Sequence, residues 1–379
     1  MNTQKICVIG DGLTGLTTAL AMANCDLQVD LYVKGNEKIK KDIRTTAISE
    51  LNFQFMKQVL GGKNLQYMWP CKKINLYYEN NKKQLNFLNF NEKSSRLMYI
   101  FQNYKLRKSL INKILLNKNI KLIKNSINKI DHNDNSVLLK RKKIFYDIII
   151  LSTGSRSKLF NTMNVKRSIF KDYKQTAVTS ILNHDYKING ASQYFLKEGP
   201  LAILPFGKKM FSIVWSLDNK FYEEKKSSIK TLIITKIKKL MPEFKKLQIQ
   251  EIHSFPLKLE LKTKYFKKNV LILGDALHSV HPVAGQGFNL ILKDIKKLSH
   301  LILKNKRLGL QIKDSSILKN FTDERKPENI IIGLGIDLTN TFFRNNSFFP
   351  FKEKIIKNIN NFGFLKKISK FVSNGGIIN

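Results

Sequence analysis

The stretch 270–289 (VLILGDALHSVHPVAGQGFN) constrains this chain most, because twenty residues combine a strand, a glycine turn and the start of a helix. Residues 270–273 are all apolar, which predicts a fully buried strand of a parallel sheet. Gly274 ends the strand with a residue that is free to adopt a positive φ, and Asp275 follows with a carboxylate. A hydroxyl of a polyol or ribityl chain would bond to that carboxylate, so we predict a ligand-binding loop.

The second half of the same stretch predicts the N-terminus of a helix. Pro282 lacks a backbone donor, and Gly285, Gln286 and Gly287 bring little side-chain bulk just before the apolar run that starts at Phe288. Backbone N–H groups at a helix N-terminus, reinforced by the helix dipole, suit an anion or an electron-rich ring carbonyl.

A second glycine turn lies at the start of the chain. Residues 5–9 (KICVI) predict a strand, and the GxGxxG pattern of Gly10, Gly12 and Gly15 leads from it into a helical run at 16–23. In this setting Gly10 serves the tight turn, Gly12 lets the backbone approach a pyrophosphate, and Gly15 allows close packing of helix on strand. The pattern predicts a dinucleotide-binding unit.

The run 274–289 resembles the second flavin-binding motif of the FAD-dependent aromatic hydroxylases, which share the para-hydroxybenzoate hydroxylase fold. It is most similar to the ubiquinone-biosynthesis branch, whose typical form is G-(D/N)-A-A-H-x-x-H-P-x-A-G-Q-G-x-N. The resemblance implies that Asp275 holds the flavin ribityl chain and that Pro282, Gly285, Gln286 and Gly287 lie along the isoalloxazine ring. A glycine-rich turn of another α/β protein is the alternative. Together with the N-terminal fingerprint, the motif predicts FAD as the cofactor.

Two further segments resemble this family. Residues 42–49 (DIRTTAIS) resemble its D-x-R-x-x-A-(L/I)-S segment, which implies that Arg44 lies against the flavin and its phosphates. An ordinary surface arginine is the alternative. Residues 99–110 resemble the Y-x-x-x-N-x-x-L-R-x-x-L element, which implies that Gln102 approaches the flavin from the start of a helix; a simple helix cap at Asn103 is the alternative.

The segments 199–205 (GPLAILP) and 212–216 (SIVWS) resemble the ubiquinone branch in particular. The resemblance implies a sheet that covers the flavin and lines a substrate cavity. An ordinary sheet core is the alternative for most of these apolar residues. Between 75 and 90 an alternating pattern about a polar turn predicts a β-hairpin that belongs to the same second domain.

The sequence departs from the family pattern at two places. The acidic residue that usually ends the second strand and binds the adenosine ribose is replaced by Val33 or Lys34. In 152–157 (STGSRS) Thr153 replaces the aspartate of the family's G-A-D-G-x-x-S run. This change argues against direct hydride transfer from NAD(P)H, so the reductant is either NAD(P)H or another electron donor. No side-chain nucleophile or base is identifiable, and we assign no catalytic residue.

Length and composition predict two domains, because 379 residues exceed the usual single-domain size and 42% hydrophobic content suits a globular core. The predicted fold class is α/β, with a Rossmann-like FAD-binding domain, an inserted, mainly antiparallel β-sheet substrate domain and C-terminal helices. The predicted boundaries are 1–70, 96–175 and 262–335 for the FAD-binding domain, 71–95 and 176–261 for the substrate domain, and 336–379 for a C-terminal helical segment.

The net charge of +39 favours an anionic partner, either a membrane surface or a nucleic acid. A lysine-rich composition throughout the chain is the competing explanation, and the absence of a nucleic-acid-binding motif argues against nucleic acid. Phenylalanines interleaved with lysines from Phe342 onwards suit either an amphipathic helix on an anionic membrane or packing against the core.

Cysteine and histidine usage predicts a reducing compartment. The three cysteines show no CxxC spacing, and the six histidines show no metal-ligand pattern, so neither a metal site nor a disulfide framework is expected. Without a leader or a long apolar stretch, we expect a cytoplasmic protein, with a peripheral place at the inner face of the membrane as the alternative.

Taken together, the resemblance implies an FAD-dependent monooxygenase. It would use O₂ to hydroxylate the aromatic ring of a polyprenylated phenol in ubiquinone biosynthesis, through a flavin C4a-hydroperoxide. One alternative is a reductase or halogenase on the same scaffold. The other is a non-catalytic or weakly flavin-binding subunit of a quinone-synthesis complex, which the departures at Val33, Lys34 and Thr153 would explain.

Overall fold

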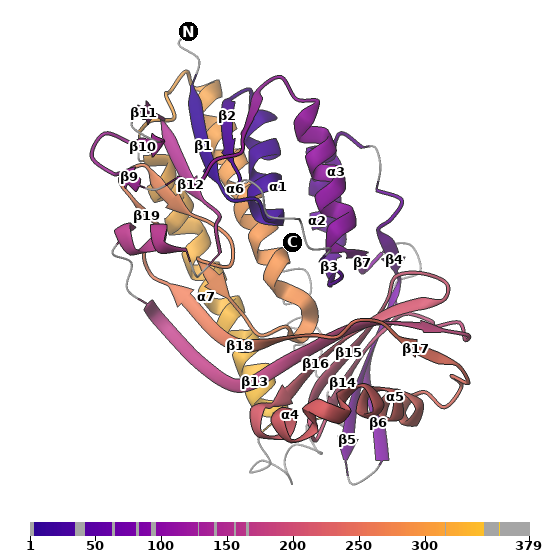
Figure 1. Ribbon diagram of the computed structural model, residues 1–379. Coiled ribbons are helices and arrows are strands. Elements are labelled where there is room, and N and C mark those ends of the chain that lie inside the picture. Colours follow the sequence, from indigo (N-terminus) through magenta and orange to yellow (C-terminus); the bar gives the residue numbers. More distant parts are fainter. Residues whose placement is uncertain are drawn as a thin grey trace.

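The computed structural model has two parts, a parallel sheet with helices around it and a large, mainly antiparallel sheet (Figure 1). The structure describes residues 4–34, 42–62, 65–80, 83–91, 96–127, 129–139, 142–154, 157–163, 167–314, 316–344 and 356. Every residue that the sequence singled out for flavin binding lies within these ranges.

The first part is built on a six-stranded sheet with the order β19-β20-β12-β1-β2-β8. All neighbours in it are parallel except the short edge strand β19, which runs antiparallel to β20. Its strands are β1 (Lys5–Ile9), β2 (Gln28–Tyr32), β8 (Ile120–Ile123), β12 (Ile148–Leu151), β19 (Phe266–Lys267) and β20 (Val270–Ile272). The predicted strands at 5–9, 148–151 and 270–273 therefore lie side by side, although they are far apart in the sequence.

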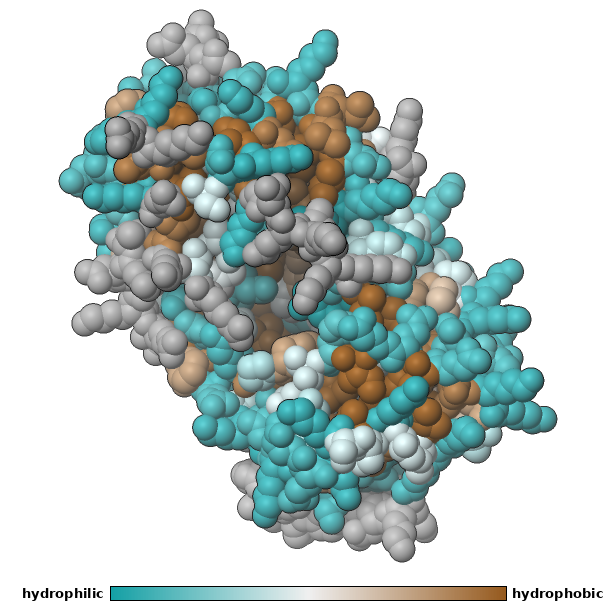
Figure 2. Space-filling view, viewed as in Figure 1, coloured by the Kyte–Doolittle hydropathy of each residue, from teal (hydrophilic) through white to brown (hydrophobic). Residues whose placement is uncertain are grey.

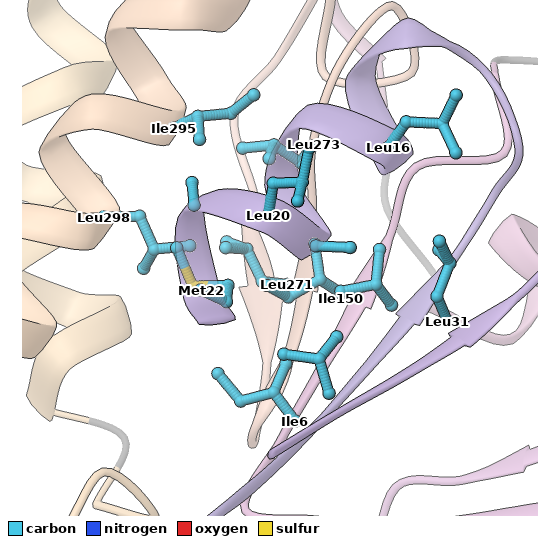
Figure 3. Packing of buried hydrophobic residues seen from close by; sticks show 14 of the residues in the cluster. Ile6, Leu16, Leu20, Met22, Leu31, Ile150, Leu271, Leu273, Ile295 and Leu298 are labelled. Carbon is cyan, nitrogen blue, oxygen red and sulfur yellow. The ribbon is translucent and has the colours of Figure 1, made fainter. Parts of the chain in front are cut away.

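Three helices pack with this sheet, and their bounds are α1 (Leu13–Ala23), α3 (Asn103–Leu115) and α6 (Gln286–Arg307). Figure 3 shows α1 between the sheet and α6. Leu20 and Met22 of α1 pack in one cluster with Leu271 of the sheet and with Leu298 of α6. Nine of the eleven residues of α1 are buried. Such a helix needs small residues where it approaches the strands, and its alanines and glycine meet that need.

The second part is a nine-stranded sheet with the order β21-β18-β13-β16-β15-β14-β5-β6, and β17 pairs with β13 beside this path. Its strands are β5 (Lys73–Asn80), β6 (Lys83–Asn91), β13 (Arg167–His184), β14 (Ala191–Leu196), β15 (Gly199–Pro205), β16 (Met210–Asp218), β17 (Leu247–Ile249), β18 (His253–Lys262) and β21 (His278–Ser279). The pair β14–β5 is parallel and the other pairs are antiparallel. The hairpin predicted between 75 and 90 is β5–β6, and it lies in this sheet.

The two faces of this sheet have different neighbours. Trp215 on β16 is fully buried in a cluster with Ile233 and Ile237 of α5 (Ile229–Leu240). With α4 (Asn219–Lys225) and the short 3₁₀ turn η2 (Lys226–Ser228), α5 covers the face turned away from the parallel sheet (Figure 1). The opposite face of the nine-stranded sheet is thereby directed towards the first part of the molecule.

Smaller elements complete the two parts. A three-stranded sheet with the order β3-β7-β4 lies beside α2, and a second one has the order β11-β10-β9. Their bounds are β3 (Thr45–Ser49), α2 (Glu50–Leu60), β4 (Trp69–Cys71), β7 (Met98–Gln102), β9 (Lys129–Asp131), β10 (Ser136–Leu139) and β11 (Lys142–Phe145), and the 3₁₀ turns are η1 (Lys158–Met163) and η3 (Val283–Gly285).

A long helix, α7 (Ser316–Arg344), runs from the first part to the second (Figure 1). Near its start Arg325 bonds to Asp294 of α6, and near its end the Lys171 ammonium of β13 lies 2.7 Å from the Asp337 carboxylate. Of the phenylalanine-rich tail, Phe342 and Phe343 pack against a cluster that includes Phe195. Most of the tail lies outside the described residues, so the proposed amphipathic helix there stays a prediction.

The fold class is confirmed: a Rossmann-like unit, a mainly antiparallel sheet inserted into it and helices near the C-terminal end. The exact domain boundaries stay a prediction. In the structure β13, the longest strand of the second sheet, begins at Arg167.

Candidate flavin site

Two glycine turns that are far apart in the sequence meet at the carboxyl end of the parallel sheet. A Cβ atom on Gly10 would lie 2.4 Å from the Ser152 carbonyl oxygen at the end of β12, and one on Gly15 would lie 2.1 Å from the Gly10 carbonyl oxygen. A Cβ atom on Gly274, whose φ is +90°, would lie 3.0 Å from Thr14. Glycine is therefore required for the close approach of strand, turn and helix at this point.

The start of α1 is suited to a phosphate group. Its N-cap is Gly12, and the described part of the chain supplies no side chain that caps it. A Cβ atom on Gly12 would meet nothing within 4 Å, so this glycine is not required by packing. An uncapped helix start with open space beside its N-cap fits a pyrophosphate held by a helix N-terminus.

Arg107 is a candidate that we did not single out from the sequence, although it stands in the segment that resembles the family. It projects from α3, and its Nη2 lies 3.6 Å from the Asp11 carboxylate in the glycine turn. Its Nη1 is buried and has no hydrogen-bond partner among the described residues. A half-buried guanidinium with a spare donor beside an uncapped helix start fits a phosphate oxygen. The basic position one helical turn after the helix start was the available signal.

Arg44 is exposed, and a neighbouring carboxylate holds its guanidinium. Its Nε and Nη2 atoms form two bonds of 2.8 and 2.7 Å to the carboxylate of Asp42, which also accepts a bond of 3.1 Å from Asn103. Desolvation raises the pKa of the Asp42 carboxyl, but the hydrogen bond and charge of Arg44 outweigh it and leave that pKa below its usual value. The two hydrogen bonds to the Asp42 carboxylate thus fix the direction of the Arg44 guanidinium.

Gln102 and Asn103 lie beside Arg44. Gln102 is the N-cap of α3 and pairs with Thr45 in the β3–β7 ladder, and the Asn103 N–H donates to the Arg44 carbonyl oxygen at 2.9 Å. The alternative of Asn103 as a simple helix cap is wrong, because Asn103 is the first residue inside the helix. Its side chain bonds instead to Thr46 and Asp42.

Asp275 directly follows Gly274 and is exposed. The protein around it nevertheless desolvates the carboxyl and raises its pKa, while the charges of His278 and Arg44 lower it. Arg44 is near enough for its charge to act on the Asp275 carboxyl.

The segment that precedes α6 has the predicted helix start. Gly285 is the N-cap of α6 with φ +62°, and Gln286 is the first helical residue. Cβ atoms on Gly285 and Gly287 would come no closer than 3.8 and 4.0 Å to their nearest neighbours, so both positions are roomy. Pro282 lies half-buried directly before η3.

Asn289, which we had not singled out, anchors this helix start. Its Oδ1 accepts bonds from the Ser49 N–H at 2.9 Å and the Asn52 amide at 2.7 Å, and its Nδ2 donates to the carbonyls of Ala47 and Gly285 at 3.0 Å each. The side chain thereby joins the Arg44 segment to the Gly285 turn. Its place as the last residue of the motif was the available signal.

Further polar atoms around the helix start of α1 have no partner. The hydroxyls of Ser152 and Thr153, at the end of β12, are buried and unbonded within the described ranges. Val33, which takes the usual place of the ribose-binding acid together with Lys34, is half-buried just after β2. Unbonded buried hydroxyls are unusual in a finished protein core, and they fit a site completed by a ligand.

The second sheet lies over this group of segments. The hydroxyls of Thr45 on β3 and Ser212 on β16 are in hydrogen-bond contact, and Val214 packs in one cluster with Val280 of the flavin loop. Figure 2 shows the visible face of the molecule hollowed between the two parts. The site residues therefore lie between the parallel sheet and the nine-stranded sheet.

Comparison with known proteins agrees with this geometry. Residues 142–328 match the family described as FAD binding domain. The p-nitrophenol 4-monooxygenase PnpA from Pseudomonas putida superimposes with a TM-score of 0.79 over 100% of this chain and 99% of that protein, at 12% identity. Klebsiella pneumoniae HpxO, solved with FAD and uric acid, superimposes with a TM-score of 0.75 over 99% of this chain and 98% of that protein, at 13% identity. The chain has the fold of the FAD-dependent monooxygenases.

Among sequence relatives, the ubiquinone biosynthesis monooxygenase COQ6 of Dictyostelium discoideum is 27% identical, over 96% of this chain and 88% of that protein. The ubiquinone hydroxylase UbiL of Rhodospirillum rubrum is 28% identical, over 46% of this chain and 41% of that protein. The match to UbiL thus spans less than half of that relative's length. These findings confirm the resemblance to the flavin-dependent aromatic hydroxylases and confirm FAD as the cofactor.

The structure brings all ten predicted flavin-binding residues into this one region, but their individual roles stay predictions. They are Gly10, Gly12, Gly15, Arg44, Gln102, Asp275, Pro282, Gly285, Gln286 and Gly287. Within the described ranges, no three His, Cys, Asp or Glu side chains are grouped to hold a metal ion, and no helix is long and apolar enough to span a membrane.

Proposed function

We propose that this chain is an FAD-dependent monooxygenase that hydroxylates the aromatic ring of a polyprenylated phenol in ubiquinone biosynthesis. The observation that carries the proposal is the meeting of the two glycine turns under the nine-stranded sheet, which brings together an uncapped helix start, Arg107 and Asp275. The ring substrate is proposed from the ubiquinone hydroxylases to which the chain is similar.

The side chains divide the work of holding the cofactor. The start of α1 and Arg107 would hold the pyrophosphate, and Arg44, fixed by Asp42, would stand beside it. The Asp275 carboxylate would accept bonds from the ribityl hydroxyls, and the roomy turn at Gly285 and Gly287 would admit the isoalloxazine ring. When bound, FAD supplies the redox chemistry, which transfers one atom of O₂ to an electron-rich ring.

The protein itself provides orientation and the exclusion of water. The face of the nine-stranded sheet that carries Ser212 and Val214 closes the site from the other side. In a site closed to water, an activated oxygen atom reaches the substrate rather than solvent. We assign no side chain as a base or nucleophile.

The electron donor and the surroundings of the protein are also proposals. Thr153 stands in place of an acid that the family uses near nicotinamide, so the reductant is NAD(P)H or a separate electron-transfer protein. A prenylated substrate and a net charge of +39 support association with an anionic membrane surface from the cytoplasmic side, or with a quinone-synthesis complex. A polyprenyl chain is too apolar to reach the site from water at a useful concentration.

The decisive experiment is the visible spectrum of the purified protein during anaerobic reduction and re-exposure to air with a prenylated phenol. We expect flavin bands that bleach on reduction and return in air, together with a product that carries one additional oxygen atom from ¹⁸O₂. A G12A variant, which fills the open space at the start of α1, serves as the matched control; it should bind FAD at least tenfold more weakly and give correspondingly weaker flavin bands and less product. A wild-type protein that gains no flavin bands when FAD is added would favour the non-catalytic scaffold instead.

A further inference from the structure

His281 directly precedes the flavin-ring segment and is completely buried. Its Nδ1 atom accepts a hydrogen bond from the Val283 N–H at 3.2 Å, and its Nε2 atom lies 3.2 Å from the Gln175 Oε1 atom. In neutral imidazole one nitrogen accepts and the other donates. Because Nδ1 accepts here, the proton is on Nε2, which donates to Gln175.

Gln175 joins three elements at this point. Its Oε1 atom accepts a second bond, from the Asn340 amide of α7 at 3.3 Å, and both side chains are 2% exposed. The pairing of β13 with β18 shifts register between Asp172 and Gln175, and Lys174 within this bulge has φ +54°. Bulges of this kind redirect side chains. The irregularity coincides with the residue of β13 whose side chain hydrogen-bonds to His281.

The surroundings keep the imidazole neutral. Burial, together with the smaller effect of the Arg344 charge, lowers the pKa of His281 to about 3. Arg344 of α7 bonds to the Tyr173 carbonyl oxygen and to Asp218, and the Tyr173 ring meets the imidazole edge-on at 4.9 Å. Asp337 of α7 is engaged with Lys171. Among the residues that the structure describes, no carboxylate is bonded to His281, in contrast to His278, whose Nε2 atom lies 2.6 Å from Asp294.

We propose that His281 is a positioning residue that fixes the segment 282–285 against the substrate sheet, through one bond to the flavin loop and one to Gln175. The proposal rests on the proposed function, because that segment matters only if it carries the flavin ring. The bond to Val283 sets the path of the loop. The bond to Gln175 sets the distance between that loop and the sheet that closes the site.

The two bonds have separable consequences. Loss of the Val283 bond frees a buried N–H in the loop and weakens flavin binding even without substrate. Loss of the Gln175 bond leaves the loop intact but loosens its position relative to the sheet. A misplaced substrate ring receives oxygen less often, and the two electrons from the reductant then leave as H₂O₂, with two protons, rather than in hydroxylated product.

Two conservative variants separate these bonds. In His281→Asn the Oδ1 atom occupies the position of Nδ1 and keeps the Val283 bond, whereas the amide of His281→Gln reaches the Nε2 position and keeps the Gln175 bond. Gln175→Leu removes the second bond from the other side, and Gln175→Glu keeps an acceptor there. His184→Asn is the control for loss of a buried imidazole, because His184 lies between Phe211 and Phe244 on the opposite face of the sheet.

The first measurement is the Kd for FAD, from quenching of flavin fluorescence, with the visible spectrum of the bound flavin. We expect His281→Gln to weaken binding at least tenfold and to shift the flavin bands, while His281→Asn, Gln175→Leu and His184→Asn stay within threefold of wild type. Equal losses in His281→Asn and His281→Gln would mean that the imidazole only fills space, and the proposal would be overturned.

The second measurement is the ratio of H₂O₂ to hydroxylated product. We expect His281→Asn and Gln175→Leu to raise it at least threefold and Gln175→Glu to restore it. A ratio equal to wild type in both loss variants would overturn the link to Gln175. Should His281→Gln fail to fold, the variants Gln175→Leu and Gln175→Glu still test the role of the bond between His281 and Gln175. If wild type binds FAD but hydroxylates no phenol, the proposed function fails, while the FAD-binding measurement still tests the role of His281.

Discussion

The helix starts of α1 and α6 are both glycine-rich and both uncapped, yet they are held in different ways. At α1 the backbone itself is packed so closely that Cβ atoms on Gly10 and Gly15 would lie within 2.4 Å of carbonyl oxygens. At α6 the glycines have room, and the turn is held by the side chains of Asn289 and His281. One start is thus fixed by backbone packing and the other by hydrogen bonds from distant elements, which implies different responses to mutation and to pH.

The largest effect is expected when backbone packing at α1 is broken. Gly15→Ala would place a methyl group 2.1 Å from the Gly10 carbonyl oxygen, so helix and turn would have to separate. We expect a loss of about 3 kcal/mol or more in the free energy of unfolding, measured by urea denaturation. Gly287→Ala, with its nearest neighbour at 4.0 Å, is the matched control at α6. Equal free energies of unfolding for Gly15→Ala and Gly287→Ala would show that the two helix starts do not differ in how closely their backbones are packed.

A smaller but still substantial effect is expected when the side-chain anchor of α6 is removed. Asn289→Ala leaves the Ser49 N–H and the Asn52 amide without their shared acceptor, and the Ala47 and Gly285 carbonyls without a donor. Because each buried group left unsatisfied costs about 1–3 kcal/mol and some regain water, we expect a loss of about 3 kcal/mol by urea denaturation. A loss below about 1 kcal/mol would show that the anchor is dispensable.

Of the two helix starts, only that of α6 depends on a histidine, so only there should the contribution to the free energy of unfolding change between pH 7 and pH 5. The pKa of His281 is about 3 in the native state, against about 6.5 in an unfolded chain, so between these pH values the unfolded state binds a proton that the native state does not. Stability is therefore lost as pH falls below about 6.5, by about 2 kcal/mol at pH 5. Urea denaturation at pH 7 and pH 5 should show that His281→Asn loses about 2 kcal/mol less than wild type. Identical losses would contradict a buried neutral imidazole.

The smallest effect on stability is expected at Gly12. Its φ of −75° suits any residue, and an added Cβ would meet open space. Gly12→Ala should lower the free energy of unfolding of the FAD-free protein by only about 1 kcal/mol, because alanine is a poorer N-cap residue than glycine but causes no clash. The Kd for FAD, measured by fluorescence, should rise at least tenfold because the methyl group occupies the approach to the helix start. Unchanged FAD affinity would place the pyrophosphate elsewhere.

This contrast also explains what could be predicted from the sequence. The GxGxxG turn was predictable because its glycines and neighbouring strand are local, and the strands at 148–151 and 270–272 were predictable because runs of apolar residues mark buried parallel strands. The motif 274–289 placed the second turn. No local pattern could show that Asn289 reaches Ala47 and Ser49, or that a bulge in β13 directs Gln175 at His281, because those bonds join residues more than 100 positions apart.

The α7 helix has a consequence for how the molecule opens. Its 29 residues span roughly 44 Å, and ion pairs hold its first half to α6 through Arg325 and its second half to β13 through Asp337. A long helix that is bound to both parts of the molecule resists hinge bending between the two sheets. We therefore expect both sheets to melt in a single calorimetric transition, and substrate exchange to proceed through movements of individual loops rather than of whole domains.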